Sequence, residues 1–402
     1  MASHEHQPGA LEGIRVLDLS RILAGPTATQ LLGDLGADVI KIERPGAGDD
    51  TRAWGPPFLT GEDGEVMPES AYYVCANRNK RSVAVDISTP EGAATVRALL
   101  RNCDVLVENF KVGGLAKYGL SYDDLRREFP RLVYCSITGF GQTGPNAHKA
   151  GYDLMAQGYG GIMSLTGPAA GEPTKVAVGI ADVMTGMYAA TAILAALRHR
   201  DRTGEGQHID LALVDCQVAW LVNEGANYLV SGRAPERRGN QHPNIVPYQV
   251  FEAVDGHFIL AVGNDAQFAR FCEVIGAPEL ASDPAFQANR ARLANREELI
   301  CRIASIVRTL DRKWLGSELE RRGVPAGPIH TLPEVFQSDQ VMARGMRVTM
   351  PCPGVRGGAI EVIGNPIKMS RTPVTYRRPP PGCGADTEAV LGELCALQPS
   401  DT

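Results

Sequence analysis

The sequence lacks the spaced cysteines and histidines of a protein-built metal site. Its nine cysteines are scattered along 402 residues without a CxxC pair, and its eight histidines form no HxxxH or HExxH pattern. An odd number of widely spaced cysteines also argues against a disulfide framework and favours a reducing compartment. We therefore expect neither a bound metal nor a fold held together by disulfides.

Two phosphate-binding signatures are also missing. The chain has no GxxxxGK[ST] motif, and the first predicted strand leads into SRILAGPTATQ (20–30) where a dinucleotide-binding protein would have GxGxxG. These absences disfavour a P-loop enzyme and a nicotinamide-dependent dehydrogenase. We expect no NAD cofactor.

Targeting and charge signals are weak. The N-terminal stretch MASHEHQPGALEGIRV lacks the basic and apolar regions of an export signal, and the longest nearly uncharged apolar run, 183–197, is short for a bilayer span. We interpret that run as a buried helix whose small residues allow close packing. The formal net charge of −6 gives no general attraction to nucleic acid or to an anionic membrane. We expect a cytoplasmic protein that acts on small molecules.

The first half of the chain alternates strand and helix patterns. Apolar runs predict strands at 13–20, 37–44, 81–87, 104–110 and 131–138, and helical patterns lie between them, among them 27–36 and 90–102. This alternation predicts an α/β fold with a parallel sheet covered by helices on both faces. Ligands of such sheets bind in loops beyond the carboxyl ends of the strands. The loops of interest are therefore SRILAGP, ERPGAGDDTR, ENFKVGG and TGFGQTGP.

Composition changes at SGRAPERRGNQHPN (231–244), which is polar and contains glycine and proline. A hairpin pattern at 248–263 and helical patterns at 265–322 follow it, and strand character returns near 355–370. We therefore divide the chain into a large domain at 10–230, a small α+β domain at 231–335, and a segment at 336–402 that returns to the large domain.

Three basic clusters fall at predicted strand ends. They comprise Arg44 and Arg52, then Arg78, Lys80 and Arg81, and finally Lys111 and Lys117. Each cluster alone is more typical of a solvated surface than of a binding site. Together, at one edge of one sheet, they predict a pocket for a ligand with several phosphates.

One carboxylate stands out in AGYDLMAQGYGG (150–161). Asp153 lies among small and apolar residues, and Gly158, Gly160 and Gly161 follow it. The residue can serve as a helix N-cap, as half of a salt bridge, or as a nucleophile that forms an anhydride with an acyl group. In the last case the glycines would let a bulky thioester approach the backbone. The residues alone leave these alternatives open.

Several motifs, in order, resemble the class III CoA-transferases of the formyl-CoA:oxalate and carnitine type. They are LEGIRVLDLSRILAGP (11–26), LGDLGADVIKIERPGAGDDTR (32–52), ENF (108–110), SITGFGQTGP (136–145) and AGYD (150–153). Within that family, DDTRAWGPPF, NRNKRSVAVDI, GNQHPNIVPYQVF and RRGVPAGPI are most similar to the succinyl-CoA:glutarate transferases.

The resemblance implies a fold and a mechanism. The large domain would be Rossmann-like, and two subunits would interlock as a homodimer. Asp153 matches the catalytic aspartate of the family. Through aspartyl anhydride and aspartyl-CoA thioester intermediates, it would carry CoA from a donor such as succinyl-CoA to an acid such as glutarate. Coenzyme A would be the co-substrate, and no metal or ATP would be needed.

The resemblance also implies CoA-binding residues. These are Leu23, Ala24, Arg44, Asn77, Asn79, Lys80, Asn109, Phe110, Lys111 and Lys117. Leu23 stands where the oxalate enzymes have glutamine, and leucine cannot hydrogen-bond to an oxalyl group. Arg52, Arg78 and residues 240–242 are weaker candidates for binding the acceptor acid.

An alternative is an isomerase of the α-methylacyl-CoA racemase type. The racemases have a histidine directly before the aspartate of this loop, and this chain has Tyr152. A tyrosine with a pKa near 10 is a poor base at neutral pH. The sequence therefore favours the transferase.

Overall fold

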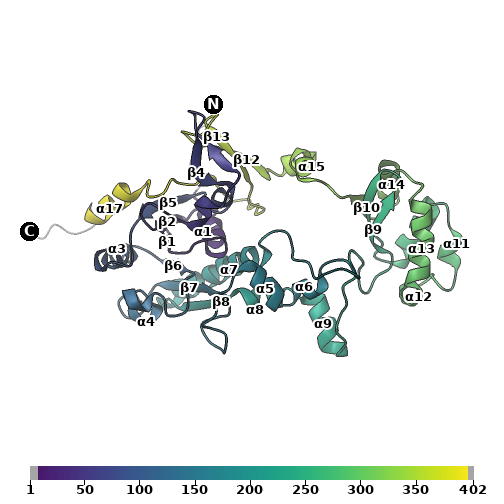
Figure 1. Ribbon diagram of the computed structural model, residues 1–402, viewed down its shortest axis with the longest axis horizontal. Coiled ribbons are helices and arrows are strands. Elements are labelled where there is room, and N and C mark those ends of the chain that lie inside the picture. The colour runs from purple at the N-terminus through teal and green to yellow at the C-terminus, as the bar shows by residue number, and fades with distance from the viewer. Residues whose placement is uncertain (1–7, 397–402) are drawn as a thin grey trace, which may run out of the picture. The chain divides into compact units, whose positions relative to one another are not determined.

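The computed structural model describes residues 8–396 and divides the chain into two compact units (Figure 1). Unit 1 comprises residues up to Met163 together with Lys175–Arg233 and the segment from Gln340 onward; unit 2 comprises Ser164–Thr174 and Ala234–Asp339. Unit 2 thus includes a short segment, 164–174, that composition alone does not indicate.

Unit 1 is built on a six-stranded parallel sheet of order β5-β2-β1-β6-β7-β8. The strands are β1 (Arg15–Asp18), β2 (Asp38–Glu43), β5 (Lys80–Ala84), β6 (Val105–Glu108), β7 (Val133–Thr138) and β8 (His208–Ala212). The strand order reverses between β1 and β6, which is where open α/β sheets bind ligands. The α/β fold class predicted from the sequence is confirmed.

Helices cover both faces of this sheet. One face packs on α1 (Ala24–Asp34) and α7 (Ile180–Thr203), and the other on α3 (Pro90–Leu100), α4 (Tyr122–Leu125) and α17 (Thr387–Ala396). Local chemistry sets the ends of these helices: at α3, for example, the Thr89 side chain accepts from Gly92 N–H and Pro90 opens the first turn.

Helix α7 contains the apolar run noted in the sequence. A side chain at Gly186 would come within 2.7 Å of the Ala24 carbonyl, so glycine allows α1 and α7 to approach closely. The helix is longer than the run, and by length and composition alone it passes for a membrane span; 56% of its most apolar window is buried inside the molecule. Such burial is typical of a core helix.

The remaining elements of unit 1 are short. They are η1 (Asp50–Ala53), β3 (Phe58–Thr60), β4 (Val66–Ser70), α2 (Ala71–Val74), η2 (Ala116–Tyr118), α5 (Asp153–Tyr159), α8 (Leu213–Ala219), α9 (Val222–Ser231), α16 (Asp339–Ala343), β12 (Arg347–Pro351) and β13 (Ala359–Ile363). Strands β12 and β13 form an antiparallel pair whose inner side chains share a small core with Val74.

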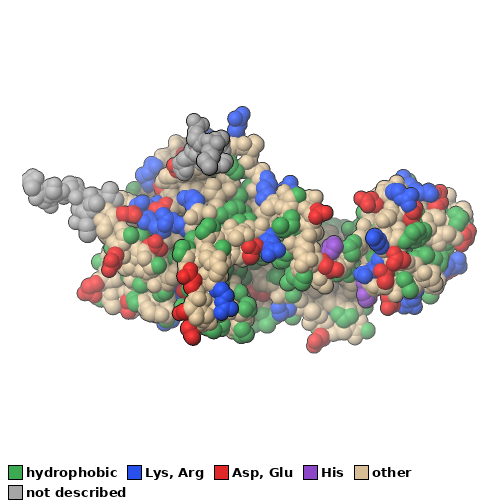
Figure 2. Space-filling view, turned by 90° about the horizontal axis from the view of Figure 1, so that it is seen from above, with side chains coloured by type: hydrophobic (Ala, Val, Ile, Leu, Met, Phe, Trp, Pro, Cys, Tyr) green, Lys and Arg blue, Asp and Glu red, His purple; other side chains and the backbone are tan. Residues whose placement is uncertain are grey.

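Unit 2 has its own core around the three-stranded sheet β11-β10-β9. The hairpin β9 (Tyr248–Ala253) and β10 (Gly256–Ala261) confirms the sequence pattern, and β11 (Ala326–Pro328) completes the sheet. Its helices are α10 (Asp265–Val274), α11 (Glu279–Ser282), α12 (Asn289–Ala294), α13 (Arg296–Val307), α14 (Arg312–Arg321) and α15 (Leu332–Gln337), while α6 (Ile162–Leu165) spans the boundary between the units. On the face seen in Figure 2, basic and acidic side chains are interspersed.

Candidate active site

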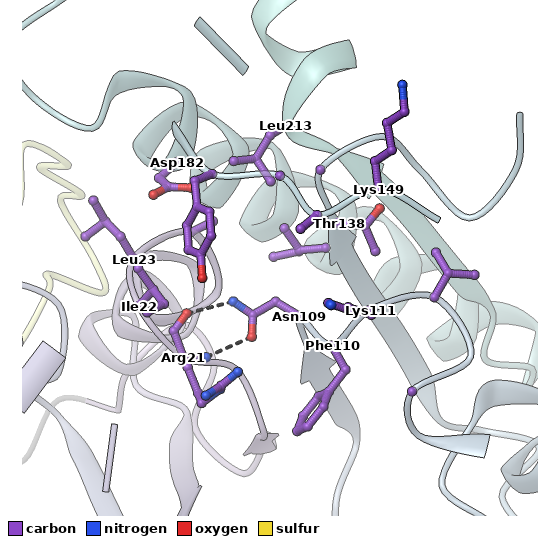
Figure 3. A pocket seen from close by; sticks show the side chains of 18 of the residues that line it. Arg21, Ile22, Leu23, Asn109, Phe110, Lys111, Thr138, Lys149, Asp182 and Leu213 are labelled. Carbon is purple, nitrogen blue, oxygen red and sulfur yellow. Dashed lines mark hydrogen bonds between the residues drawn. The ribbon is translucent and has the colours of Figure 1, made fainter. Parts of the chain in front are cut away.

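A cavity of about 650 Å³ opens at the carboxyl ends of the unit 1 strands (Figure 3). All four loops chosen from the sequence contribute to its wall, so their convergence at one edge of the sheet is confirmed. The lining includes Arg21, Ile22, Leu23, Ala24, Asp50, Trp54, Asn109, Phe110, Lys111, Lys117, Thr138, Gly139, Lys149, Gly151, Tyr152, Asp182 and Leu213.

The loops after β1 and β6 are tied together by one side chain. Asn109 Oδ1 accepts from Arg21 N–H at 2.9 Å and its Nδ2 donates to the Arg21 carbonyl at 2.7 Å, as the dashed lines in Figure 3 show. The next residue, Ile22, has φ of 73°, a costly conformation for a β-branched side chain, and its N–H points to both oxygens of Asp49 at 3.3 Å.

Buried ion pairs support the loop that follows β1. Lys41 contacts Asp49 at 2.9 Å and donates to the Ser20 carbonyl, and Lys80 contacts Asp18 at 3.1 Å. All four charged side chains are fully buried, and burial lowers the pKa of Lys80 to about 8. Removing one partner would leave an unpaired charge in the core, so these pairs fix the loop in place.

Asp153 is the first residue of α5 and does not line the cavity. Its Oδ2 accepts from Gln157 Nε2 at 2.7 Å, and its Oδ1 accepts from Ala181 N–H at 2.8 Å. The helix N-cap is Tyr152, so the interpretation of Asp153 as an N-cap is wrong. The carboxylate instead joins the starts of α5 and α7.

Asp182, in the first turn of α7, is part of the cavity wall (Figure 3). Its side chain is 8% exposed. Burial and the neighbouring Asp153 raise the pKa of Asp182 to about 7. In the part of the chain that the structure describes, no donor or basic side chain neutralises it. Sequence reasoning missed this residue, because a single acid at the head of an Ala-rich helix resembles ordinary first-turn capping.

The three glycines after Asp153 lie outside the cavity, so their role in admitting a thioester stays a prediction. A side chain at Gly160 would meet Gln217 Cγ at 2.5 Å, and Gly161 has φ of 90°, so these two positions serve the packing and the turn at the end of α5. Space beside Asp153 comes from Gly179, where a Cβ would lie 3.0 Å from Leu23 and 3.8 Å from the Asp153 carboxyl carbon.

Six of the ten residues predicted to bind CoA lie together in the cavity wall. They are Leu23, Ala24, Asn109, Phe110, Lys111 and Lys117. Two basic residues that the sequence did not single out, Arg21 and Lys149, join them. Arg44 lines an adjoining cavity of about 300 Å³ that shares Arg21, Phe110 and Tyr118 with the first.

The other three predicted CoA-binding residues are buried and lie outside both cavities. Asn77 donates to the Tyr73 carbonyl, Asn79 donates to Asp34, and Lys80 donates to Asp18 and Asn77. Their contribution to CoA binding stays a prediction, and the contacts seen are internal to the fold.

The sequence predicted that three basic clusters form one pocket for a ligand with several phosphates. This prediction is wrong for three of their arginines. Arg52 pairs with Glu43 at 2.6 Å and Glu69 at 2.9 Å, Arg78 pairs with Asp34, and Arg81 pairs with Asp38 and Glu393. These guanidinium groups are committed to internal carboxylates, so Arg52 and Arg78 are also poor candidates for binding an acceptor acid.

Comparison with known proteins gives the family. The sequence model of CoA-transferase family III matches residues 11–387. The chain belongs to that family. It is 52% identical over 396 residues to the succinate–glutarate CoA-transferase of Agrobacterium fabrum, covering 98% of this chain and 97% of that protein. It is 45% identical over 385 residues to the succinyl-CoA:glutarate CoA-transferase of Homo sapiens, covering 96% and 86%.

A solved structure confirms the fold of this family member. The crystal structure of a CAIB/BAIF family protein from Brucella suis is 48% identical and superposes with a TM-score of 0.86, covering 96% of this chain and 100% of that one. A crystal structure of a hypothetical protein from Mycobacterium tuberculosis, 28% identical, gives a TM-score of 0.83 with 96% and 100% covered.

Proposed function

We propose that this family III chain transfers CoA from an acyl-CoA donor such as succinyl-CoA to a free dicarboxylic acid such as glutarate. One observation carries the proposal: two hydrogen bonds hold the carboxylate of Asp153 directly after Gly151 and Tyr152, which lie in the wall of a cavity that also presents Arg21, Lys111, Lys117 and Lys149. The cations suit the phosphates of CoA, and the carboxyl suits the thioester. The names of the relatives support the two acids.

We propose Asp153 as the nucleophile, as the resemblance implies. Its two oxygens accept one hydrogen bond each, from Gln157 and from Ala181 N–H, so each oxygen keeps a second lone pair that can attack a thioester. These bonds hold the carboxylate in one orientation directly after Gly151 and Tyr152 of the cavity wall. Burial and Asp153 raise the pKa of Asp182 to about 7, so this neighbouring carboxyl can hold a proton beside the nucleophile near neutral pH.

The proposed reaction proceeds by four acyl transfers. The carboxylate attacks the donor thioester, which gives an aspartyl mixed anhydride and CoA thiolate. The thiolate attacks the aspartyl carbonyl, which gives an aspartyl-CoA thioester and releases the donor acid. The acceptor carboxylate then attacks that thioester, and the thiolate finally attacks the acceptor carbonyl of the new anhydride. One thioester replaces another, so the energy of the thioester bond is conserved.

The proposal includes a homodimer in the cytoplasm. Apolar side chains are exposed on α5, α7 and α9 of unit 1, among them Leu154, Met155, Met187 and Leu229. Exposed apolar side chains of this size suit burial against a partner, and a second copy of this chain is the partner that the resemblance implies. Light scattering after size-exclusion chromatography tests it: a monomeric mass would contradict the dimer.

A panel of acids tests the activity. The purified protein is incubated with succinyl-CoA and glutarate, 3-hydroxy-3-methylglutarate, adipate, itaconate, malate, oxalate or carnitine, and mass spectrometry detects the new acyl-CoA. We expect glutaryl-CoA and no oxalyl-CoA. Loss of stereochemistry from a chiral 2-methylacyl-CoA, with no transfer to any acid, would favour an isomerase.

A further inference from the structure

Glu108, the last residue of β6, is a buried carboxyl that neither the cavity wall nor the proposed reaction uses. It is 5% exposed and continues the row of side chains that begins with the core residue Leu106. Burial raises the pKa of Glu108 to about 7. A carboxyl at such a place destabilises the fold relative to an apolar side chain, which calls for a compensating role.

The contacts of Glu108 lead in two directions. Toward the cavity, its Oε2 accepts from Phe110 N–H at 2.7 Å. Toward the sheet interior, it hydrogen-bonds to Ser136, its register partner on β7, and the Ser136 hydroxyl lies 2.9 Å from His208 Nε2 on β8. The result is a hydrogen-bonded chain from His208 through Ser136 and Glu108 to the backbone of Phe110.

The far end of this chain is rigid. The His208 ring stacks on Tyr122 with centroids 4.8 Å apart and meets the edge of Tyr134 at 5.5 Å. The two tyrosines therefore fix the imidazole, which fixes Ser136 and, through it, the carboxyl of Glu108. These side chains line a cavity of about 240 Å³ behind the segment 111–114, whose residues Lys111, Val112 and Gly114 also line the main cavity.

The Glu108 end of this hydrogen-bonded chain holds a segment of the cavity wall that contains several candidate CoA-binding residues. Asn109, Phe110 and Lys111 follow Glu108 directly, and Figure 3 shows Phe110 and Lys111 at the cavity and Asn109 bonded to Arg21. We propose that Glu108, held by Ser136 and His208, is a positioning residue that sets the affinity for acyl-CoA by fixing the Asn109–Lys111 segment. This inference rests on the proposed function, because it takes the main cavity to be the CoA site.

Matched substitutions test it through a KM-against-kcat split and direct CoA binding. Glu108→Met keeps the length of the side chain and removes the acceptor for Phe110 N–H. We expect KM for acyl-CoA and Kd for free CoA to rise about tenfold, the usual effect of orphaning a buried backbone donor, with kcat within about twofold of the wild type. Glu108→Gln keeps an acceptor and can donate to Ser136, so its KM and Kd should stay within about twofold of the wild type.

Ser136→Ala is the second variant if Glu108→Met does not fold. It leaves Glu108 in place without its inner donor, and KM for acyl-CoA should rise about threefold. Glu205→Met, at an exposed glutamate before β8, is the control and should change nothing. Unchanged KM and Kd in Glu108→Met, or in Ser136→Ala, would overturn the inference, as would Glu108→Gln being as impaired as Glu108→Met. Because Kd for free CoA needs no turnover, a wild type that binds CoA without transferring it would count against the proposed function alone.

Discussion

Asp153 and Asp182 meet at the start of one helix: Ala181 N–H, adjacent to Asp182, donates to Asp153 Oδ1 at 2.8 Å. The two carboxyls have different surroundings, because Asp153 is satisfied by Gln157 and Ala181 while Asp182 is buried without a donor among the described residues. Two acids in unlike environments can take separate roles.

Substituting each aspartate separates these roles. Asp153→Asn removes the proposed nucleophile while keeping an acceptor for Ala181 N–H, and we expect turnover to fall on the order of a thousandfold or more. Asp182→Asn keeps the size of a side chain that forms no covalent bond in the proposed reaction, so the loss should be within about a hundredfold. Acyl-CoA turnover with succinyl-CoA and glutarate measures both. A fully inactive Asp182→Asn beside an active Asp153→Asn would reverse the assignment.

The pH dependence of the reaction should report on Asp182. Its pKa of about 7 is raised by burial and by Asp153. Above that pH the ionised Asp182 places a second negative charge beside the anionic intermediates formed on Asp153, so we expect kcat/KM for acyl-CoA to fall as the pH increases through about 7. In Asp182→Asn this falling limb should be absent. A limb that stays in place in that variant would show that Asp182 does not act on the reaction.

Asp182 should also destabilise the fold at neutral and higher pH. The pKa of its carboxyl rises from 3.8 to about 7 on folding, so the folded state holds a proton that the unfolded state has released across this window. Stability contributed by this group is present below about pH 4 and is lost as the pH rises through about 7, at a cost on the order of 4 kcal/mol. Thermal unfolding should show Asp182→Asn more stable than the wild type at pH 8 and nearly equal at pH 4. Equal stability at both would contradict the pKa shift.

The lysines of the cavity wall should bind phosphate. Lys111→Gln and Lys149→Gln are each expected to raise KM for acyl-CoA about three- to tenfold, with kcat nearly unchanged, because a lost charge-assisted contact weakens binding without touching the thioester. Steady-state kinetics at two salt concentrations checks this, since the defect should shrink at high salt. Lys313→Gln, at an exposed position of α14, should behave as the wild type. Equal behaviour of all three variants would remove the cavity from the account of CoA binding.

Local patterns in the sequence were sufficient for the sheet and its loops. Strands such as 104–110 are short apolar runs, and the carboxyl-end rule then brings the loops after β1, β2, β6 and β7 to one edge. The hairpin β3–β4 was not predicted, because residues 58–70 are rich in polar residues, glycine and proline.

Side-chain partners could not be predicted, because they come from distant parts of the chain. The partners of Arg78 and Lys80 are Asp34 and Asp18, which lie on other elements, so basic residues that look like a phosphate site are internal ion pairs. Asp182 was overlooked for the opposite reason: its sequence neighbours are apolar, and only the fold shows that they leave its carboxyl facing a cavity.

The central claim is a covalent aspartyl-CoA intermediate on Asp153, and trapping it is the most direct test. The wild-type enzyme is mixed with succinyl-CoA without an acceptor, treated with hydroxylamine, digested and examined by mass spectrometry for an aspartyl hydroxamate. The account predicts the modification on the peptide that contains Asp153, and its loss in Asp153→Asn. Modification on the peptide that contains Asp182, or on no aspartate while CoA transfer proceeds, would contradict it.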